Sequence, residues 1–124
     1  MIKLVYCLRR LPELSREEFQ RYWRETHGPL VRERATVLGI QRYVQVHTLD
    51  GPLNEALRAS RGSEPEIYDG VAELWWESAE ALAAGTTTLE GRQAGRELFE
   101  DEKQFIDFAR SVVFVAEEHP FVGD

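Results

Sequence analysis

The sequence predicts an α+β domain in which helices cover one face of a four-stranded antiparallel sheet, the split βαβ arrangement. Four short runs are rich in branched and aromatic residues and have turn residues at most of their boundaries. Segments with helical spacing lie between the first and second runs and between the third and fourth. A chain of 124 residues has the size of one domain. We therefore expect residues 1–124 to form a single domain.

The four runs are the predicted strands, at residues 2–9, 40–49, 70–77 and 111–118. Side chains alternate between the two faces of a strand, so Trp75 and Trp76 point to opposite sides. Both faces of the sheet therefore carry apolar residues. An exposed apolar face of that size is larger than monomers usually tolerate, so we expect a homodimer through the sheet faces.

The first helix is predicted from its start signal and its apolar spacing. Ser15 and Glu18 have the spacing of a capping box. Trp23 and His27 are four residues apart, so the imidazole is predicted to project from the apolar side. The Gly28–Pro29 pair is predicted to end the helix in a sharp turn, before a second helical segment that runs to residue 38.

The later helices and the long middle connection are less regular. Residues 78–85 and 89–109 are predicted to be helical, with Leu98, Phe105 and Phe108 on one side. Residues 50–70 are rich in glycine, proline and charge, which indicates a long, exposed connection with one helical turn at residues 53–59.

Composition excludes several classes of function. The formal charge of −7 argues against a nucleic-acid partner, although 13 of the 15 basic residues are arginines. Cys7 is the only cysteine, so the chain has no internal disulfide or zinc set, and we expect it to be a small buried apolar residue in a cytoplasmic protein. The three histidines lack metal-ligand spacing, so no metal is expected. The apolar start is too short for a membrane span and does not have the pattern of a signal peptide.

His27 is the leading candidate for chemistry, because imidazole exchanges a proton near neutral pH and the neighbouring aromatic residues exclude water. Asp101 or Glu102, which flank the inward line of the last helix, would orient it. The alternative is a helix-end histidine that only hydrogen-bonds its neighbours, with both carboxylates in solvent. Burial lowers the pKa of a histidine and a carboxylate raises it, so the sequence leaves the direction open.

Further candidates belong to a flat apolar pocket in which a phenol orients a ligand oxygen. The catalytic set is completed by Tyr6, and the predicted binding residues are Trp23, Tyr43, Glu73, Trp75 and Phe105. Glu73 interrupts an apolar strand and ranks second as an acid or base. For each aromatic residue, packing in the core or in the dimer is the alternative.

The ordered blocks of the chain resemble those of EthD-type proteins of the dimeric α+β barrel superfamily. The blocks are "MIKLVYCLRR", "LSREEFQRYWRETHGPLV", "GIQRYVQVH", "DGVAELWW", "DEKQFIDF" and "EEH". The resemblance implies a ferredoxin-like protomer, a dimer through the sheets and a small apolar pocket between sheet and helices. His27 corresponds to the family histidine, and Asp101 with Asp107 to its acidic block. Residues 50–68 match no block.

The family includes a protein linked to degradation of a branched alkyl ether and fungal relatives that dehydrate or decarboxylate aromatic polyketides without a cofactor. The resemblance therefore predicts a protein that binds a small hydrophobic or aromatic molecule, and a possible cofactor-free lyase or cyclase. One alternative is a noncatalytic ligand-binding or accessory protein of a degradation pathway. Another is a haem-degrading or cofactor-free monooxygenase. Because most members have no assigned reaction, the resemblance predicts the scaffold more than one activity.

Overall fold

The structure is a computed structural model, and it describes residues 1–123. The strands are β1 (Ile2–Leu8), β2 (Arg42–His47), β3 (Gly70–Trp76) and β4 (Val112–Ala116). The α-helices are α1 (Arg16–Tyr22), α2 (Gly28–Leu38), α3 (Pro52–Arg61), α4 (Ala79–Ala84) and α5 (Leu89–Glu102). A π-helical turn, η1 (Trp23–His27), joins α1 to α2, and a 3₁₀ turn, η2 (Phe108–Arg110), precedes β4.

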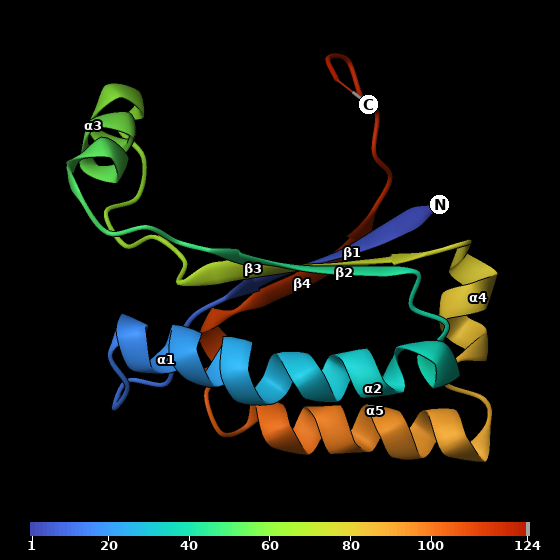
Figure 1. The fold of residues 1–124 in the computed structure, drawn as a ribbon. Helices are drawn as coiled ribbons and strands as arrows, with labels where there is room; N and C mark the ends of the chain where they lie inside the picture. The colour runs from blue at the N-terminus through green and yellow to red at the C-terminus, as the bar shows by residue number, and fades with distance from the viewer. Residues whose placement is uncertain (124) are drawn as a thin grey trace.

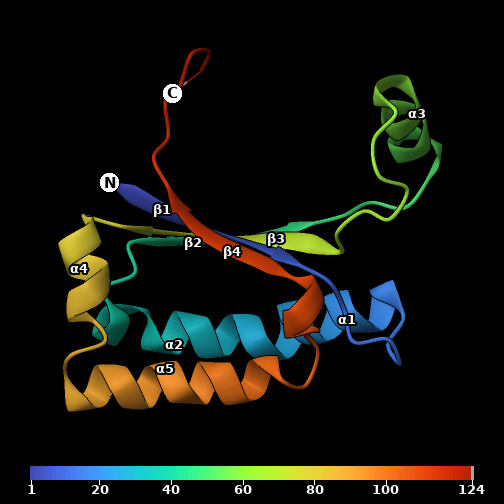
Figure 2. The same ribbon diagram turned by 180° about the vertical axis from the view of Figure 1, so that it is seen from behind.

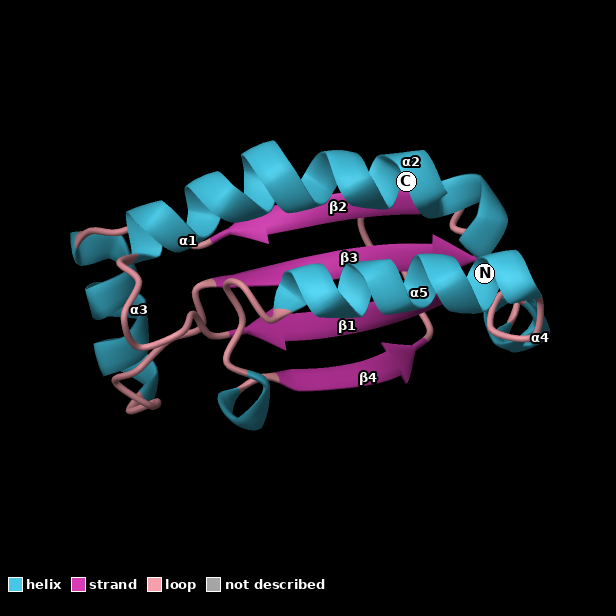
Figure 3. Cartoon of the chain, turned by 90° about the horizontal axis from the view of Figure 1, so that it is seen from below, coloured by secondary structure: helices cyan, strands magenta, loops and turns pink. Residues whose placement is uncertain are grey.

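The strands form one antiparallel sheet in the order β2-β3-β1-β4, with α1, α2 and α5 on one face (Figure 1). This arrangement confirms the predicted fold class and the central position of the first and third strands. Seen from the helix side, α2 runs along β2 and α5 along β1, and β4 extends past both helices (Figure 3). The two long helices therefore cover the sheet from β2 to β1 and leave its β4 edge open.

The core lies between the helices and the covered face of the sheet. Its largest fully buried side chains are Leu8, Phe19, Trp23 and Phe105. Phe105 lies 5.4 Å from Phe19 between ring centroids, and the aromatic packing continues from Phe19 to Trp23 at 5.6 Å. Aromatic residues from α1, η1 and the segment after α5 thus pack together under the sheet.

The first helix begins as predicted, but it does not end where predicted. Ser15 and Glu18 form the complete capping box. Gly28 has helical dihedral angles and its N–H donates to the Trp23 carbonyl, five residues back, so the chain continues into α2 without a turn. A proline ring in an α-helix clashes with the carbonyl four residues before it. Because a π turn is wider than an α turn, it relieves this clash at Pro29. The predicted sharp turn at the Gly28–Pro29 pair is therefore wrong, because the π turn accommodates Pro29 at the start of α2.

Two further predictions need correction. The last helix was predicted over residues 89–109, but α5 ends at Glu102, and Phe105 is buried in the turn that follows. Backbone hydrogen bonds between this segment and β1's end, including Asp107 N–H to the Arg9 carbonyl, draw the chain away from the helix axis. The connection at residues 50–70 contains the ten-residue helix α3 in place of one turn, closed by Gly62 in the left-handed region (φ 60°).

The face of the sheet opposite α1, α2 and α5 is largely open (Figure 1). Here α3 and the C-terminal segment both rise away from the sheet, one near each end (Figures 1 and 2). Val46, Val112 and Phe114 on this face are each more than 40% exposed. Cys7 pairs with Val112 across the strands and is half-buried, so it is less enclosed than predicted. Within residues 1–123, no helix has the length and apolar character needed to cross a membrane.

Candidate functional site

His27 occupies the last position of the π turn, under the sheet, and is 5% exposed. Its ring centroid lies 5.0 Å from that of Phe105. Its Nδ1 atom lies 2.8 Å from Oδ2 of Asp101, which is in the last turn of α5. The predicted inward orientation is confirmed, and the structure places His27 next to the carboxylate that was predicted to orient it.

Asp101 has a second partner, because the Tyr22 hydroxyl donates to Oδ1 at 2.6 Å. An ionised carboxylate only accepts hydrogen bonds, so its contact with His27 requires the ring proton to lie on Nδ1. The lone pair of a neutral His27 is then on Nε2. That atom has no hydrogen-bond partner in the described part of the chain, and it is not among the fully shielded polar atoms. One imidazole nitrogen is therefore left without a hydrogen bond among residues 1–123.

The structure also gives the direction in which the pKa of His27 is shifted. Burial lowers the pKa of His27 below its usual value, and this effect outweighs the hydrogen bond and charge of Asp101, which act in the opposite direction. A neutral imidazole in contact with a carboxylate is suited to accept a proton at neutral pH.

Glu102, the residue after Asp101, forms a second pair on the sheet side of α5. The Tyr6 hydroxyl of β1 donates to its Oε1 at 3.3 Å. Burial is the main cause that raises the pKa of Glu102 to about 7; the charge of Asp101 raises it further, and the Tyr6 hydrogen bond opposes the change. Burial, with the charge of Glu102, also raises the pKa of Tyr6. Glu102 is therefore partly protonated at neutral pH and can donate a proton.

Three of the five predicted binding residues lie in the same layer as His27. Phe105 contacts the imidazole directly. Tyr43 belongs to the core, and its hydroxyl accepts from Gln45 Nε2 at 2.8 Å. Trp23 is fully buried and stacks on His47 with ring centroids 4.5 Å apart. The three side chains belong to one core cluster, and Phe105 is the one that packs against His27.

The other two predicted binding residues lie on the opposite face of the sheet. Glu73 pairs with Lys3 at 3.2 Å. Trp75 is buried there, and its indole N–H donates to Glu118 while the Lys3 and Arg42 side chains lie over its ring. The structure does not bring either residue to His27. The alternation of side chains along β3 explains the separation, because Ala72 and Leu74 occupy its helix-facing positions.

A groove of about 520 Å³ runs between α2 and the edge strand β2. Gly28, the neighbour of His27, borders it together with Tyr43, Gln45 and His47. Its volume is in the range of small-molecule sites. Burial is the main cause that raises the pKa of Tyr43, and the charge of Glu102 adds to it.

Sequence reasoning named Glu102 only as an alternative partner of His27 and did not identify Tyr22 as part of the site. A signal for Glu102 was present, since adjacent residues of a helix point about 100° apart and Asp101 cannot face the same neighbours. No comparable signal marked Tyr22, because its partner is far away in the sequence. Within residues 1–123, no group of three or more His, Cys, Asp or Glu side chains is arranged to hold a metal ion.

The fold and the site define a ferredoxin-like α+β domain with a buried histidine–carboxylate pair beneath its sheet. The family model of the EthD domain matches residues 11–109. The chain belongs to the EthD family, which confirms the resemblance found in its sequence blocks.

Solved structures agree with this fold. An ethyl tert-butyl ether D (EthD) family protein from Bacillus halodurans aligns with a TM-score of 0.63 and 22% identity, over 96% of this chain and 99% of that one. An EthD-like protein from Ralstonia eutropha gives a TM-score of 0.59 and 19% identity, over 94% and 90%. A dimeric protein of unknown function with a ferredoxin-like fold, from Bacteroides fragilis, gives 0.59 and 8%, over 94% and 95%. No curated protein sequence matches the chain.

Proposed function

We propose that this EthD-family protein is a cytoplasmic homodimer that binds a small hydrophobic or aromatic molecule and transfers protons on it without a cofactor. The observation that carries the proposal is the juxtaposition of two different carboxylate pairs on consecutive residues of α5. Asp101 holds a neutral His27, and Glu102, with its pKa near 7, accepts a hydrogen bond from Tyr6. One pair supplies a base and the other an acid, in surroundings of aromatic side chains.

In a dehydration, His27 Nε2 would take a proton from a substrate carbon while Glu102 protonates the departing hydroxyl group. A carbon–carbon double bond forms and water leaves. Asp101 would hold the imidazole and stabilise the imidazolium, and Tyr6 would donate a hydrogen bond to the Glu102 carboxylate. Exchange with solvent would then take the proton from the imidazolium and return one to Glu102, which restores both groups. The mechanism requires a substrate that enters from the groove beside Tyr43 and reaches both groups.

The homodimer is supported by the open sheet face and by β4. Val112, Val113, Phe114 and Val115 are between 46% and 55% exposed, so both faces of this edge strand present apolar side chains to solvent. A second copy on the open sheet face would cover Val112 and Phe114, and α3 and the C-terminal segment would flank it (Figure 2). Sedimentation at micromolar concentration is expected to give twice the 14.3 kDa mass of the chain. A stable monomer across that range would contradict the dimer.

A noncatalytic ligand-binding protein is the second candidate, and one observation favours it. The groove bordered by Tyr43 and Gln45 is not lined by His27. A molecule held there would be bound without contact with the imidazole.

Substitution of His27 separates the two candidates. We would first identify a ligand by screening small aromatic and ether compounds for a concentration-dependent rise in melting temperature. His27→Gln is expected to keep the fold and to lower turnover of a true substrate by about two to four orders of magnitude. His119→Gln is the matched control, because His119 is exposed and lies outside the site. Equal conversion by the parent and His27→Gln would overturn the catalytic assignment, and binding without conversion by the parent would favour the second candidate.

A further inference from the structure

A second cavity, of about 340 Å³, lies between α3, the loop that leads into β3 and the start of α1. It is separate from the His27 site and shares no lining residue with the groove beside Tyr43. Its walls are strongly charged. The charged side chains that line it are Arg9, Arg10, Arg16, Arg58 and Arg110, with Asp50, Glu55, Glu66 and Asp69.

The balance of charge at this cavity differs from that of the whole chain. Five arginines against four carboxylates give a formal charge of +1, whereas the chain carries −7. Arg58 lines the cavity and has no carboxylate within ion-pair distance among residues 1–123. The cavity lining therefore carries a small net positive charge in an acidic protein, and Arg58 is its arginine without an ion pair among residues 1–123.

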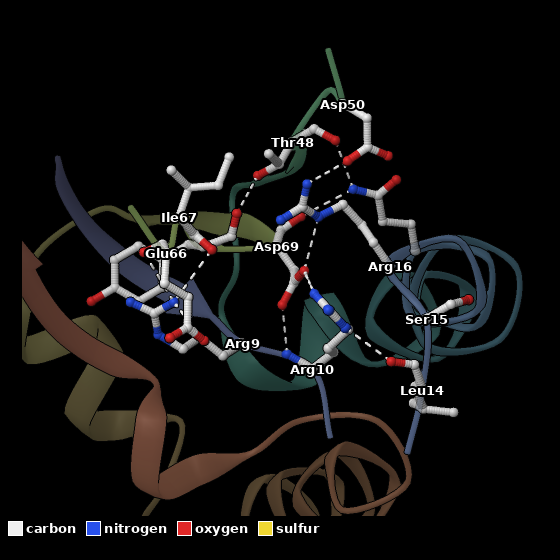
Figure 4. Close-up of polar contacts among 12 residues, drawn as sticks. Arg9, Arg10, Leu14, Ser15, Arg16, Thr48, Asp50, Glu66, Ile67 and Asp69 are labelled. Carbon is white, nitrogen blue, oxygen red and sulfur yellow. Dashed lines mark hydrogen bonds and ion pairs between the residues drawn. The ribbon is translucent and has the colours of Figure 1, made fainter. Parts of the chain in front are cut away.

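The inner part of the cluster is fixed by one buried carboxylate. Asp69 is 2% exposed, and its Oδ1 accepts from Arg10 at 2.5 Å and from Arg16 Nε at 2.9 Å. Its Oδ2 accepts from the backbone N–H of Arg10 at 2.8 Å. Figure 4 shows Asp69 at the centre of these contacts. The buried Asp69 carboxylate thus fixes the positions of the Arg10 and Arg16 guanidinium groups.

The outer contacts are made to carboxylates that lie in solvent. Asp50, whose side chain is 79% exposed, accepts from the outer nitrogen of Arg16 at 2.5 Å. Glu66, 63% exposed, pairs with Arg9 at 3.6 Å and with Arg110. In Figure 4, Arg16 with Asp50 and Arg9 with Glu66 lie on opposite sides of Asp69. Exposed ion pairs contribute little to stability, so another anion can replace either carboxylate at small cost.

We propose that this cavity binds a small dicarboxylate, whose two ends take the places of the Asp50 and Glu66 side chains. The planar guanidinium of arginine matches a carboxylate with two parallel hydrogen bonds. Arg16 would hold one end, Arg9 and Arg110 the other, and Arg58 adds unmatched positive charge. The proposal does not depend on the chemistry proposed for His27.

Calorimetric titration of the whole protein at low ionic strength tests the proposal, with succinate, glutarate and adipate as probes. We expect saturable binding at millimolar concentration or below, tighter for at least one dicarboxylate than for acetate or inorganic phosphate. Asp50→Asn removes a competitor and is expected to tighten dicarboxylate binding by about two- to fivefold. Arg58→Gln is expected to weaken it by a similar factor. Arg61→Gln is the control on the same helix, because Arg61 does not line the cavity.

Titration of both the parent and Asp50→Asn distinguishes a ligand site from a cluster that only holds α3 in place. A structural cluster gives no saturable heat with any probe in either protein, which would overturn the proposal. Phosphate binding tighter than every dicarboxylate would overturn the assignment of a two-ended ligand, as would acetate binding of equal strength. Weaker dicarboxylate binding in folded Asp50→Asn would show that the ligand does not replace Asp50, and would also overturn it.

Discussion

Asp69 and Glu102 are two carboxylates that the fold shields from solvent, and their partners are of different kinds. Asp69 contacts the guanidinium groups of Arg10 and Arg16. Glu102 has the uncharged Tyr6 as its side-chain partner and the carboxylate of Asp101 as its sequence neighbour. It also lies at the C-terminal end of α5, where the helix dipole disfavours negative charge. Burial raises the pKa of Glu102 because no cationic side chain among residues 1–123 pairs with it, whereas Asp69 is paired with two guanidinium groups and fastens the structure.

Removal of the Asp69 charge is expected to have the largest effect on stability. Asp69→Asn removes the buried negative charge that pairs with Arg10 and Arg16 and replaces one acceptor oxygen with an NH2 donor, so the free energy of unfolding should fall by about 2–4 kcal/mol. Urea denaturation measures the change. Asp50→Asn is the matched control, since Asp50 contacts the same arginine from an exposed position and its loss should cost less than about 1 kcal/mol. Equal losses from the two variants would contradict the difference drawn between the inner and outer contacts.

The pH dependence of stability tests the description of Glu102. Because the pKa of Glu102 is higher in the folded protein than in the unfolded chain, the folded state binds more protons between pH 4.5 and about 7. Stability from this group therefore falls as the pH rises through that window, by about 2–3 kcal/mol in total. Glu102→Gln should remove this decline and be more stable than the parent at pH 8. If the two proteins show parallel curves from pH 5 to pH 8, Glu102 does not titrate as described.

His27 acts in the opposite direction. Its pKa is lowered on folding, so the unfolded chain binds more protons below pH 6.5 and stability from this group falls as the pH decreases through 6.5. In Glu102→Gln, the loss of stability below pH 6.5 should no longer be offset by the titration of Glu102. Chemical denaturation of Glu102→Gln and of the double variant with His27→Gln measures it, and the decline below pH 6.5 should be smaller in the double variant.

Tyr22 gives the smallest predicted effect. Tyr22→Phe removes the 2.6 Å hydrogen bond to Asp101 and should lower the free energy of unfolding by about 1 kcal/mol. With one donor gone, Asp101 should attract the imidazolium more strongly, so the pKa of His27 should rise. Tyr68→Phe is the control, because Tyr68 contacts Arg9 through its ring. An unchanged His27 pKa in Tyr22→Phe would show that Asp101 does not couple the two residues.

The sequence predicted most of the fold because its signals were local. Runs of branched and aromatic residues bounded by turn residues located all four strands, and the capping box at Ser15 located the start of the first helix. The sequence also predicted that Asp101 or Glu102 would orient His27. The sequence-based prediction failed at two places. The π turn at Trp23–His27, a local backbone feature, carries the helix past Pro29. After α5, backbone hydrogen bonds with the segment that follows β1 draw the chain away from the helix axis. The tyrosine partners of Asp101 and Glu102 are 79 and 96 residues away, and no local pattern indicates them.

The most direct test of the site is an NMR titration that follows the side-chain carboxyl carbon of Glu102 and the ring nitrogens of His27 in one sample. We predict a pKa of about 7 for Glu102, a pKa for His27 below its usual 6.5, and a neutral ring with its proton on Nδ1 at pH 7. Glu102→Gln assigns the carboxyl signal. A Glu102 that titrates near pH 4.5, or a His27 that is charged at pH 7, would contradict the assignment of one residue as acid and the other as base.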